Sequence, residues 1–294
     1  MERIDRKKRI LDSKRPLPKD AVNRLQEDMR LLHTYHSNAI EGNTLTLQET
    51  KLVVEEGITI GGKSLKEHLE ATGNAMAFER IVELAKARKK VDLVVVLELH
   101  EIVSRGLLKD AGRYRTQNIR IVGAKARPPD FSKVPALMDE LLKEVSRMKS
   151  HPLVKAVHLH HKLVAIHPFS DGNGRVARLV SNLILMRSGY PPVVLKKEER
   201  KKYYNSLRKA DSKNLGPFGN FVARALDESL TIYISIFGGE DELLPLSELA
   251  KDTSYSQEYL SLRARQGVLS AVKMGRTWHS TKRSLKEYIE RYGR

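Results

Sequence analysis

Apolar side chains recur every three or four residues along most of the chain, which is the spacing of an amphipathic helix. The first long run ends at Gly42 and Asn43, and one of its faces carries Leu25, Met29, Leu32, His36 and Ile40. The same spacing predicts further helices within 44–87 around a loop at 57–62, over 92–108 and over 135–148. We therefore expect a mainly α fold.

Two more helical runs flank a short polar loop. The first starts near Ser150 and Pro152, and Pro168 ends it because proline disfavours the α conformation at His167. The second has an apolar face of Val176, Leu179, Val180 and Leu183. Between them lies Asp-Gly-Asn-Gly, whose residues tolerate positive φ angles and expose backbone N–H groups.

This loop collects groups that suit a polyphosphate. Successive N–H groups at a helix N-terminus bind phosphate oxygens, and Arg175 and Arg178 can bind them bidentately. A lone carboxylate beside phosphates, here Asp171, usually holds Mg²⁺, and His167 is a natural base near neutral pH. Asp-Gly-Asn-Gly alone would favour an ordinary loop with a capping Asp, but the presence of His167, Arg175 and Arg178 favours the polyphosphate site.

The run H-P-F-S-D-G-N-G-R-V-A-R resembles the signature H-x-F-x-[DE]-G-N-G-R-x-x-R of Fic-domain proteins. The resemblance implies a Fic helical core with a short β-hairpin flap, and transfer of AMP from ATP to a hydroxyl of a target protein. His167 would then take the proton of a Ser, Thr or Tyr hydroxyl, and Asp171 would hold Mg²⁺ (or Mn²⁺). The N–H groups of Gly172, Asn173 and Gly174 would cradle the phosphates, with Arg175 as a further clamp.

A second motif lies at the end of the first long helix, over about 21–42. S-N-A-I-E-G-N resembles the inhibitory motif [ST]-x-x-x-E-[GN] of Fic proteins, with Ser37 and Glu41 at its two specified positions. By that resemblance Glu41 pairs with Arg178 and blocks the γ-phosphate. The alternative is a solvated or capping carboxylate, although a Glu at a helix C-terminus gains nothing from the helix dipole.

Other positions have two interpretations each. Ile119, Ile121 and Val122 with Gly123 predict a strand and turn, which is either the Fic flap or an ordinary surface hairpin. Tyr203 and Tyr204 resemble residues near the adenine of the family, but they equally suit core packing. We interpret four further histidines as packed or capping residues rather than catalysts or metal ligands: His100, His158, His160 and His161.

The C-terminal fifty residues predict a small separate domain at 245–294, after a polar linker at 238–244. Its pattern gives a helix, a second helix with a capping box at Ser254 and Gln257, a hairpin of 269–273 and 277–280, and a closing helix. This order is similar to a winged helix-turn-helix. The segment 245–294 contains ten Lys or Arg and five Asp or Glu, so it is positively charged. Arg263 and Arg265 on its second helix could therefore contact DNA. A protein-docking or dimer module is the alternative.

Composition sets the remaining expectations. The 294 residues include no Cys, which excludes disulfides, thiolate metal sites and Cys nucleophiles. Residues 1–20 are basic with two prolines, so we expect an irregular arm ahead of a Fic domain at 21–237. With no apolar leader or membrane-length run, we expect a cytoplasmic protein without membrane contact. We also expect a homodimer. The net charge of +17 favours anionic partners, but it equally fits a surface rich in Lys, Arg and Glu.

Three functions remain open at this point. The first is protein adenylylation with ATP as substrate, autoinhibited by Glu41. The second is removal of AMP from a modified protein, with Glu41 positioning a water molecule. The third belongs to another class, a DNA-binding regulator whose Fic core senses a nucleotide.

Overall fold

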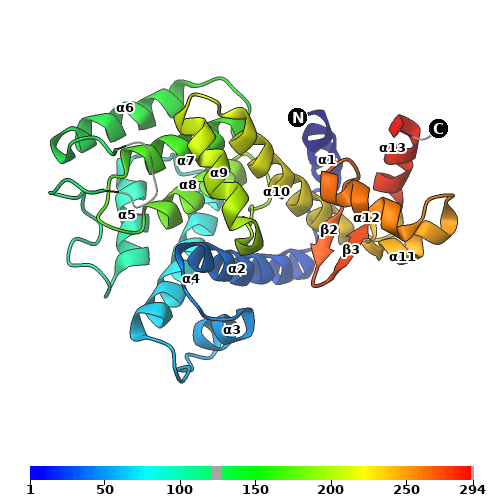
Figure 1. Ribbon diagram of the computed structural model, residues 1–294, viewed down its shortest axis with the longest axis horizontal. Helices are drawn as coiled ribbons and strands as arrows, with labels where there is room; N and C mark the ends of the chain where they lie inside the picture. The colour runs from blue at the N-terminus through cyan, green and yellow to red at the C-terminus, as the bar shows by residue number, and fades with distance from the viewer. Residues whose placement is uncertain (121–126, 293–294) are drawn as a thin grey trace. The chain divides into compact units, whose positions relative to one another are not determined.

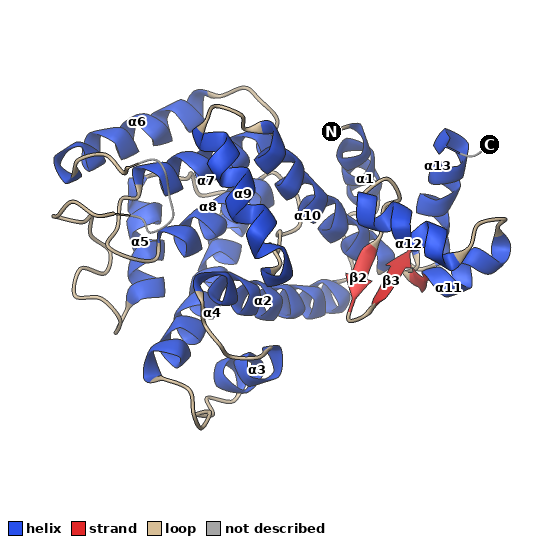
Figure 2. Ribbon diagram, in the orientation of Figure 1, coloured by secondary structure: helices blue, strands red, loops and turns tan. Residues whose placement is uncertain are grey.

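The computed structural model describes residues 1–120 and 127–292, and most of them lie in helices (Figure 2). The helices of the first three quarters of the chain are α1 (Glu2–Ser13), α2 (Lys19–Glu41), α3 (Leu47–Glu55), α4 (Leu65–Lys86), α5 (Leu93–Ser104), α6 (Val134–Arg147), α7 (Pro152–Ile166), α8 (Asn173–Arg187), α9 (Arg200–Asp211) and α10 (Gly216–Ser235). Short 3-10 turns are Phe131–Lys133, Lys197–Glu199, Gly239–Asp241 and Ala250–Asp252. The prediction of a mainly α fold is confirmed.

The chain forms two compact units. The core unit is Gln26–Val222, and the terminal unit combines Met1–Leu25 with Ala223–Arg294. This division cuts through α2 and α10 rather than following a linker. The domain boundaries expected from the sequence, near 20, 237 and 245, therefore stay a prediction.

Helix α8 is the centre of the core unit, where it packs against α7, α4 and α5 (Figure 1). Nearly every side chain from Asn173 to Leu185 is buried, including the polar residues of its first turns. Helices α4 and α5 approach closely at Gly73, where a Cβ would lie 2.9 Å from the carbonyl oxygen of Ile102. The loop at 167–172 therefore leads directly into a helix whose side chains are almost all buried.

Two neighbouring helix starts show how local sequence fixes this frame. Thr46 and Glu49 form a complete capping box at α3, and Ser64 and Glu67 form another at α4. Helix α2 ends at Glu41 because Gly42 takes a φ of +108°, which residues with a side chain rarely adopt. The chain therefore leaves α2 directly after the carboxylate of the predicted inhibitory motif.

The C-terminal part of the terminal unit holds a three-stranded antiparallel sheet. Its strands are β1 (Leu244–Pro245), β2 (Val272–Met274) and β3 (Thr277–Ser280), in the order β1-β3-β2, with Pro245 opposite His279 and Lys273 opposite Trp278. Helices α11 (Leu246–Leu249), α12 (Gln257–Gln266) and α13 (Lys282–Tyr292) supply buried Leu246, Leu249, Leu260 and Leu285. The predicted helix and hairpin order is confirmed for these residues.

Three local predictions differ from the structure. Ser256, not Ser254, caps α12 by accepting from the Tyr259 N–H, because the helix starts two residues later than a capping box at Ser254 requires. The expected linker is partly ordered, since buried Asp241 accepts two hydrogen bonds from Arg283. The strand and turn expected at Ile119–Gly123 lies largely outside the described residues, and Ile119 itself is not in a strand.

The expectation of an irregular arm over residues 1–20 is wrong for Glu2–Ser13, which form α1, and for Lys19 and Asp20, which begin α2. Helix α1 buries Ile4, Lys7 and Leu11, which share one helical face. The Nζ of Lys7 lies 2.9 Å from Asp227 Oδ1, and Arg3 lies 3.0 Å from the same carboxylate. The partner that makes this basic helix stable is more than two hundred residues away in the chain, so local composition could not reveal it.

No helix among the described residues is long and apolar enough to cross a membrane.

We predict that Asp227→Asn destabilises the protein by about 3–5 kcal/mol, because breaking a buried ion pair leaves Lys7 and Arg3 without their carboxylate. Urea unfolding followed by circular dichroism measures this difference. Lys143→Ala, which removes an exposed pair with Asp139, serves as the control and should cost less than about 1 kcal/mol. Equal effects of the two substitutions would contradict the importance of the Asp227 cluster.

Candidate functional site

His167 sits at the turn where α7 ends. Its backbone is left-handed, with φ +52° and ψ 61°, and its N–H still donates to Leu163. The ring Nδ1 lies 3.1 Å from the carbonyl oxygen of Val164, so Nδ1 carries the hydrogen and Nε2 keeps its lone pair. Burial lowers the pKa of His167, partly offset by the Val164 hydrogen bond. The side chain is therefore a neutral base whose acceptor nitrogen is Nε2.

The side chain of Asn173 closes the loop after His167. Its Oδ1 accepts from the N–H of Phe169 and its Nδ2 donates to the carbonyl of Phe169, both at 2.9 Å. Gly172 takes a φ of +81°, and its N–H donates to Asp171 Oδ1 at 2.6 Å. The loop then enters the first turn of α8, where N–H groups have no partner within the helix.

Glu41 lies against that first turn. A Cβ at Gly174 would lie 2.3 Å from Glu41 Oε1, so only glycine leaves room for the carboxylate. The same oxygen is 2.8 Å from Nη2 of Arg178, and Tyr204 donates to Glu41 Oε2 at 3.3 Å. The predicted pair of Glu41 and Arg178 is confirmed, and it lies at a helix N-terminus, a place that favours anions.

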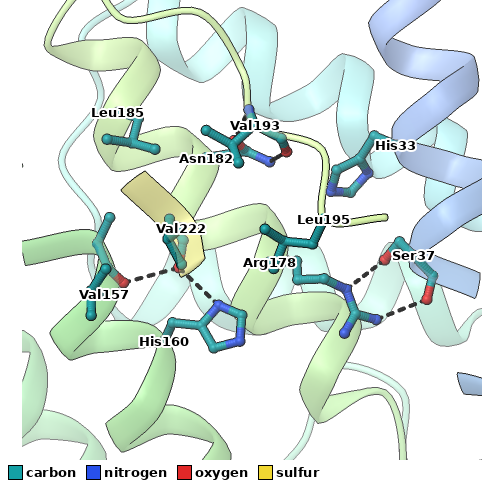
Figure 3. Close-up of a pocket in the computed structure, with 12 residues that line it drawn as sticks. His33, Ser37, Val157, His160, Arg178, Asn182, Leu185, Val193, Leu195 and Val222 are labelled. Atoms are coloured by element: carbon teal, nitrogen blue, oxygen red, sulfur yellow. Dashed lines mark hydrogen bonds between the residues drawn. The ribbon is translucent and has the colours of Figure 1, made fainter. Parts of the chain in front are cut away.

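Arg178 is held from two further directions. Its Nε donates to the Ser37 hydroxyl at 2.8 Å and its Nη2 to the Ser37 carbonyl at 2.9 Å (Figure 3). Only 2% of its side-chain surface is exposed, against 33% for Glu41. Burial alone would lower the pKa of Arg178, but Glu41 together with Tyr203 and Tyr204 outweighs burial and raises that pKa. Both predicted residues of the inhibitory motif therefore contact Arg178.

The cavity drawn in Figure 3 adjoins Arg178 but is too small for a nucleotide. It measures about 20 Å³ and its lining includes His33, His160, Asn182 and Val222. A space of this size holds about one water molecule. The loop after His167 and the first turn of α8, rather than this cavity, form the candidate site.

Arg175 is buried between two carboxylates. Its guanidinium lies 3.6 Å from Asp171 and 3.6 Å from Glu70, whose other oxygen accepts from Asn43. Asp171 itself is open, with 53% of its side chain exposed. None of the described residues forms a group of three metal-binding side chains. A cation here would depend on Asp171 together with oxygens of a bound phosphate.

His100 supports the loop from α5, a role that sequence reasoning missed. Its Nδ1 accepts from the Gly112 N–H at 3.0 Å, so Nε2 carries the hydrogen and donates to the carbonyl of Asp171 at 3.2 Å. Its ring stacks on Phe169 with centroids 3.7 Å apart. Burial lowers the pKa of His100 to about 4. The prediction of a core histidine is confirmed, and its place on the apolar face of 92–108 was the available signal.

Of the two tyrosines, Tyr203 matches the packing interpretation. It is buried against Phe218, and its hydroxyl lies 2.9 Å from His160 Nε2. Tyr204 lies closer to the site, where it contacts Glu41, and burial raises its pKa to about 12. Of the other histidines, His161 pairs with Asp211 and His158 with Glu144.

Comparisons with known proteins agree with this geometry. Residues 90–185 match the model of the Fic/DOC family. The chain is 37% identical to the protein adenylyltransferase fic-1 of Caenorhabditis briggsae over 240 residues, which are 78% of this chain and 47% of that protein. The chain thus spans about half the length of the curated relatives it matches.

Two solved structures are similar over most of the chain. A Fic domain containing signaling protein from Bacteroides thetaiotaomicron has a TM-score of 0.75 and 29% identity, over 82% of this chain and 98% of that one. Fic-1 (residues 134–508) from Caenorhabditis elegans has a TM-score of 0.70 and 35% identity, over 80% of this chain and 72% of that one.

We predict that stability falls as the pH is lowered from about 6.5 towards 4. The pKa of His100 drops from 6.5 to about 4 on folding, and that of buried His33 drops to about 3. The unfolded chain therefore binds more protons in this window, and each such histidine contributes a slope of up to about 1.4 kcal/mol per pH unit. Urea unfolding at several pH values measures the slope. His100→Gln should reduce it, and an unchanged slope would contradict a neutral His100.

Proposed function

The chain belongs to the Fic/DOC family, and we propose that it transfers AMP from ATP to a hydroxyl side chain of a target protein. The observation that carries this proposal is the orientation of His167, whose Nδ1 bonds to the Val164 carbonyl, in the loop that leads into the N-terminus of α8. A base with one defined acceptor nitrogen and a phosphate-binding helix start are the two parts that this reaction needs. The names of the curated relatives support the same activity.

The reaction follows from these groups. The phosphates of ATP would lie against the N–H groups of Gly172, Asn173 and Gly174, with Arg175 neutralising their charge. The oxygen of a target Ser, Thr or Tyr would attack the α-phosphorus while His167 Nε2 accepts its proton. The bond to the β-phosphate oxygen breaks, pyrophosphate leaves, and AMP stays on the target.

A divalent cation fits one position in this arrangement. Asp171 offers a half-exposed carboxylate, and Mg²⁺ is usually held by one or two carboxylates together with phosphate oxygens. We therefore propose that Asp171 would hold Mg²⁺ (or Mn²⁺). The ion would offset the negative charge of the phosphates.

Glu41 would keep the enzyme inactive in the absence of a signal. Its carboxylate occupies the space over Gly174 and uses Nη2 of Arg178. One guanidinium cannot bind a carboxylate and a γ-phosphate in the same geometry, so Arg178 would serve ATP only after Glu41 leaves. Removal of AMP, with Glu41 positioning a water molecule, stays the alternative within the same site.

The terminal unit supports a second, separate proposal. Its sheet and helices α11 to α13 match the order expected of a winged helix-turn-helix, and α12 carries Arg263 and Arg265. We propose that this part contacts DNA through α12. Arg263 is half-buried and bonded to Tyr259 and Gln266, whereas Arg265 is exposed and donates to the Ser261 carbonyl at 3.3 Å, so Arg265 is the better candidate for a phosphate contact. A homodimer and a cytoplasmic location stay predictions.

We predict that Glu41→Gly raises adenylylation, including self-modification, by about 10- to 100-fold. A charge-assisted hydrogen bond contributes about 1.5–3 kcal/mol, and each 1.4 kcal/mol corresponds to a factor of ten. Transfer from α-labelled ATP, in the purified protein and in a lysate, measures the effect.

Two variants control this experiment. Glu56→Gly removes an exposed carboxylate at the end of α3 and should leave activity unchanged. His167→Ala on the Glu41→Gly background should abolish transfer and preserve ATP binding. No increase in a folded Glu41→Gly variant that binds ATP would refute inhibition by Glu41, whereas loss of AMP removal from a modified target would favour the alternative reaction.

We predict that the full chain binds duplex DNA weakly and that binding weakens steeply with salt. Each phosphate contact adds about 0.9 to the slope of log affinity against log salt concentration. Fluorescence anisotropy with a labelled duplex at several salt concentrations measures this slope. Arg265→Ala should lower the slope by about 0.9, the contribution of one phosphate contact, while Lys143→Ala should leave the slope unchanged. Absence of binding at low salt would favour protein docking instead.

A further inference from the structure

Arg115 is a buried cation bonded to main-chain carbonyls. Only 3% of the residue is exposed. Its Nε donates to the carbonyl of His167 at 2.9 Å, its Nη1 to Gln117 at 2.8 Å and its Nη2 to Pro129 at 2.6 Å. Its own backbone N–H donates to the carbonyl of Pro168 at 3.0 Å. One residue therefore joins three separate main-chain segments of the core unit.

The three hydrogen bonds from the Arg115 side chain depend on the planar shape of its guanidinium. A buried charge is costly unless polar groups surround it, and here three carbonyl dipoles do so. The planar fork directs its N–H groups along fixed directions, which a lysine ammonium on a flexible stem does not reproduce. The contacts therefore depend on arginine specifically, not on a positive charge alone.

The two contacts to His167 and Pro168 fall on the most strained part of the loop. His167 is a non-glycine residue in the left-handed region, which persists only where surrounding structure holds it. Arg115 fixes two successive carbonyl groups, that of His167 through its side chain and that of Pro168 through its backbone N–H. From this backbone position, the His167 ring donates from Nδ1 to the carbonyl of Val164. The backbone that Arg115 holds thus sets where Nε2 lies.

We propose that Arg115 is a positioning residue, which keeps His167 in its left-handed conformation so that Nε2 can accept the hydroxyl proton. This inference rests on the proposed transfer reaction. The charge of Arg115 acts in the same direction, because it adds to burial in lowering the pKa of His167, while Glu41 and Asp171 oppose it. His167 therefore stays neutral and ready to accept a proton.

The first test measures turnover. On the Glu41→Gly background, Arg115→Lys and Arg115→Ala should each lower kcat about 100-fold, as a misplacement near 1 Å can do. The affinity for ATP, measured by titration, should stay within about twofold, since Arg115 contacts no predicted phosphate-binding side chain. Arg113→Lys, an exposed neighbour in the same segment, should retain full activity. Full activity of Arg115→Lys, or a parallel loss of ATP affinity, would overturn the proposal.

The second test does not need activity, so it separates failure of this proposal from failure of the proposed reaction. Nitrogen-15 spectra of labelled histidines report the tautomer and pKa of His167, assigned with His167→Ala. The Nδ1–H tautomer should dominate in the parent protein and mix with the other tautomer in both Arg115 variants. The pKa of His167 should rise in Arg115→Ala and change less in Arg115→Lys. Unchanged His167 signals in variants that stay folded by circular dichroism would refute positioning.

Discussion

The buried first turns of α8 impose the constraint on which the site depends. This helix is surrounded by α7, α4 and α5, yet it begins with polar and cationic residues. Each of them needs a partner, because a buried charge without one is costly. Asn173 satisfies the main chain of Phe169, Arg175 lies between Asp171 and Glu70, and Arg178 takes Ser37 and Glu41. Of these partners, Glu41 is the one that would have to leave before Arg178 could bind a phosphate of ATP.

The sequence predicted the helices and motifs of this site better than the contacts between segments that are distant in the chain. Local spacing was enough for α7, α8 and the loop between them, and the motif at Ser37 and Glu41 was enough for the contact with Arg178. The contacts of His100 with Gly112 and Asp171 were not predictable, since they join segments that are distant in the chain. The same reason explains why residues 1–13 were expected to be irregular.

Several histidines around α8 are neutral for one physical reason. Burial lowers the pKa of His33, His100 and His160, and in each case it is the largest cause. Neutral rings add no charge beside Arg175 and Arg178, so the field at the start of α8 comes from the arginines and carboxylates. The position of Glu41 is therefore the main variable in the local electrostatics.

Because residue 174 is a glycine, the proposed inhibition by Glu41 can be lost by mutation in some places and not in others. The carboxylate of Glu41 occupies the volume that a Cβ would need, and an ATP phosphate on the same turn of α8 would need that volume too. A larger residue at this position would displace the Glu41 carboxylate and, in the proposed reaction, crowd the phosphate of ATP as well. In the proposed enzyme, substitutions that release inhibition and spare the phosphate site therefore lie in α2 rather than at Gly174.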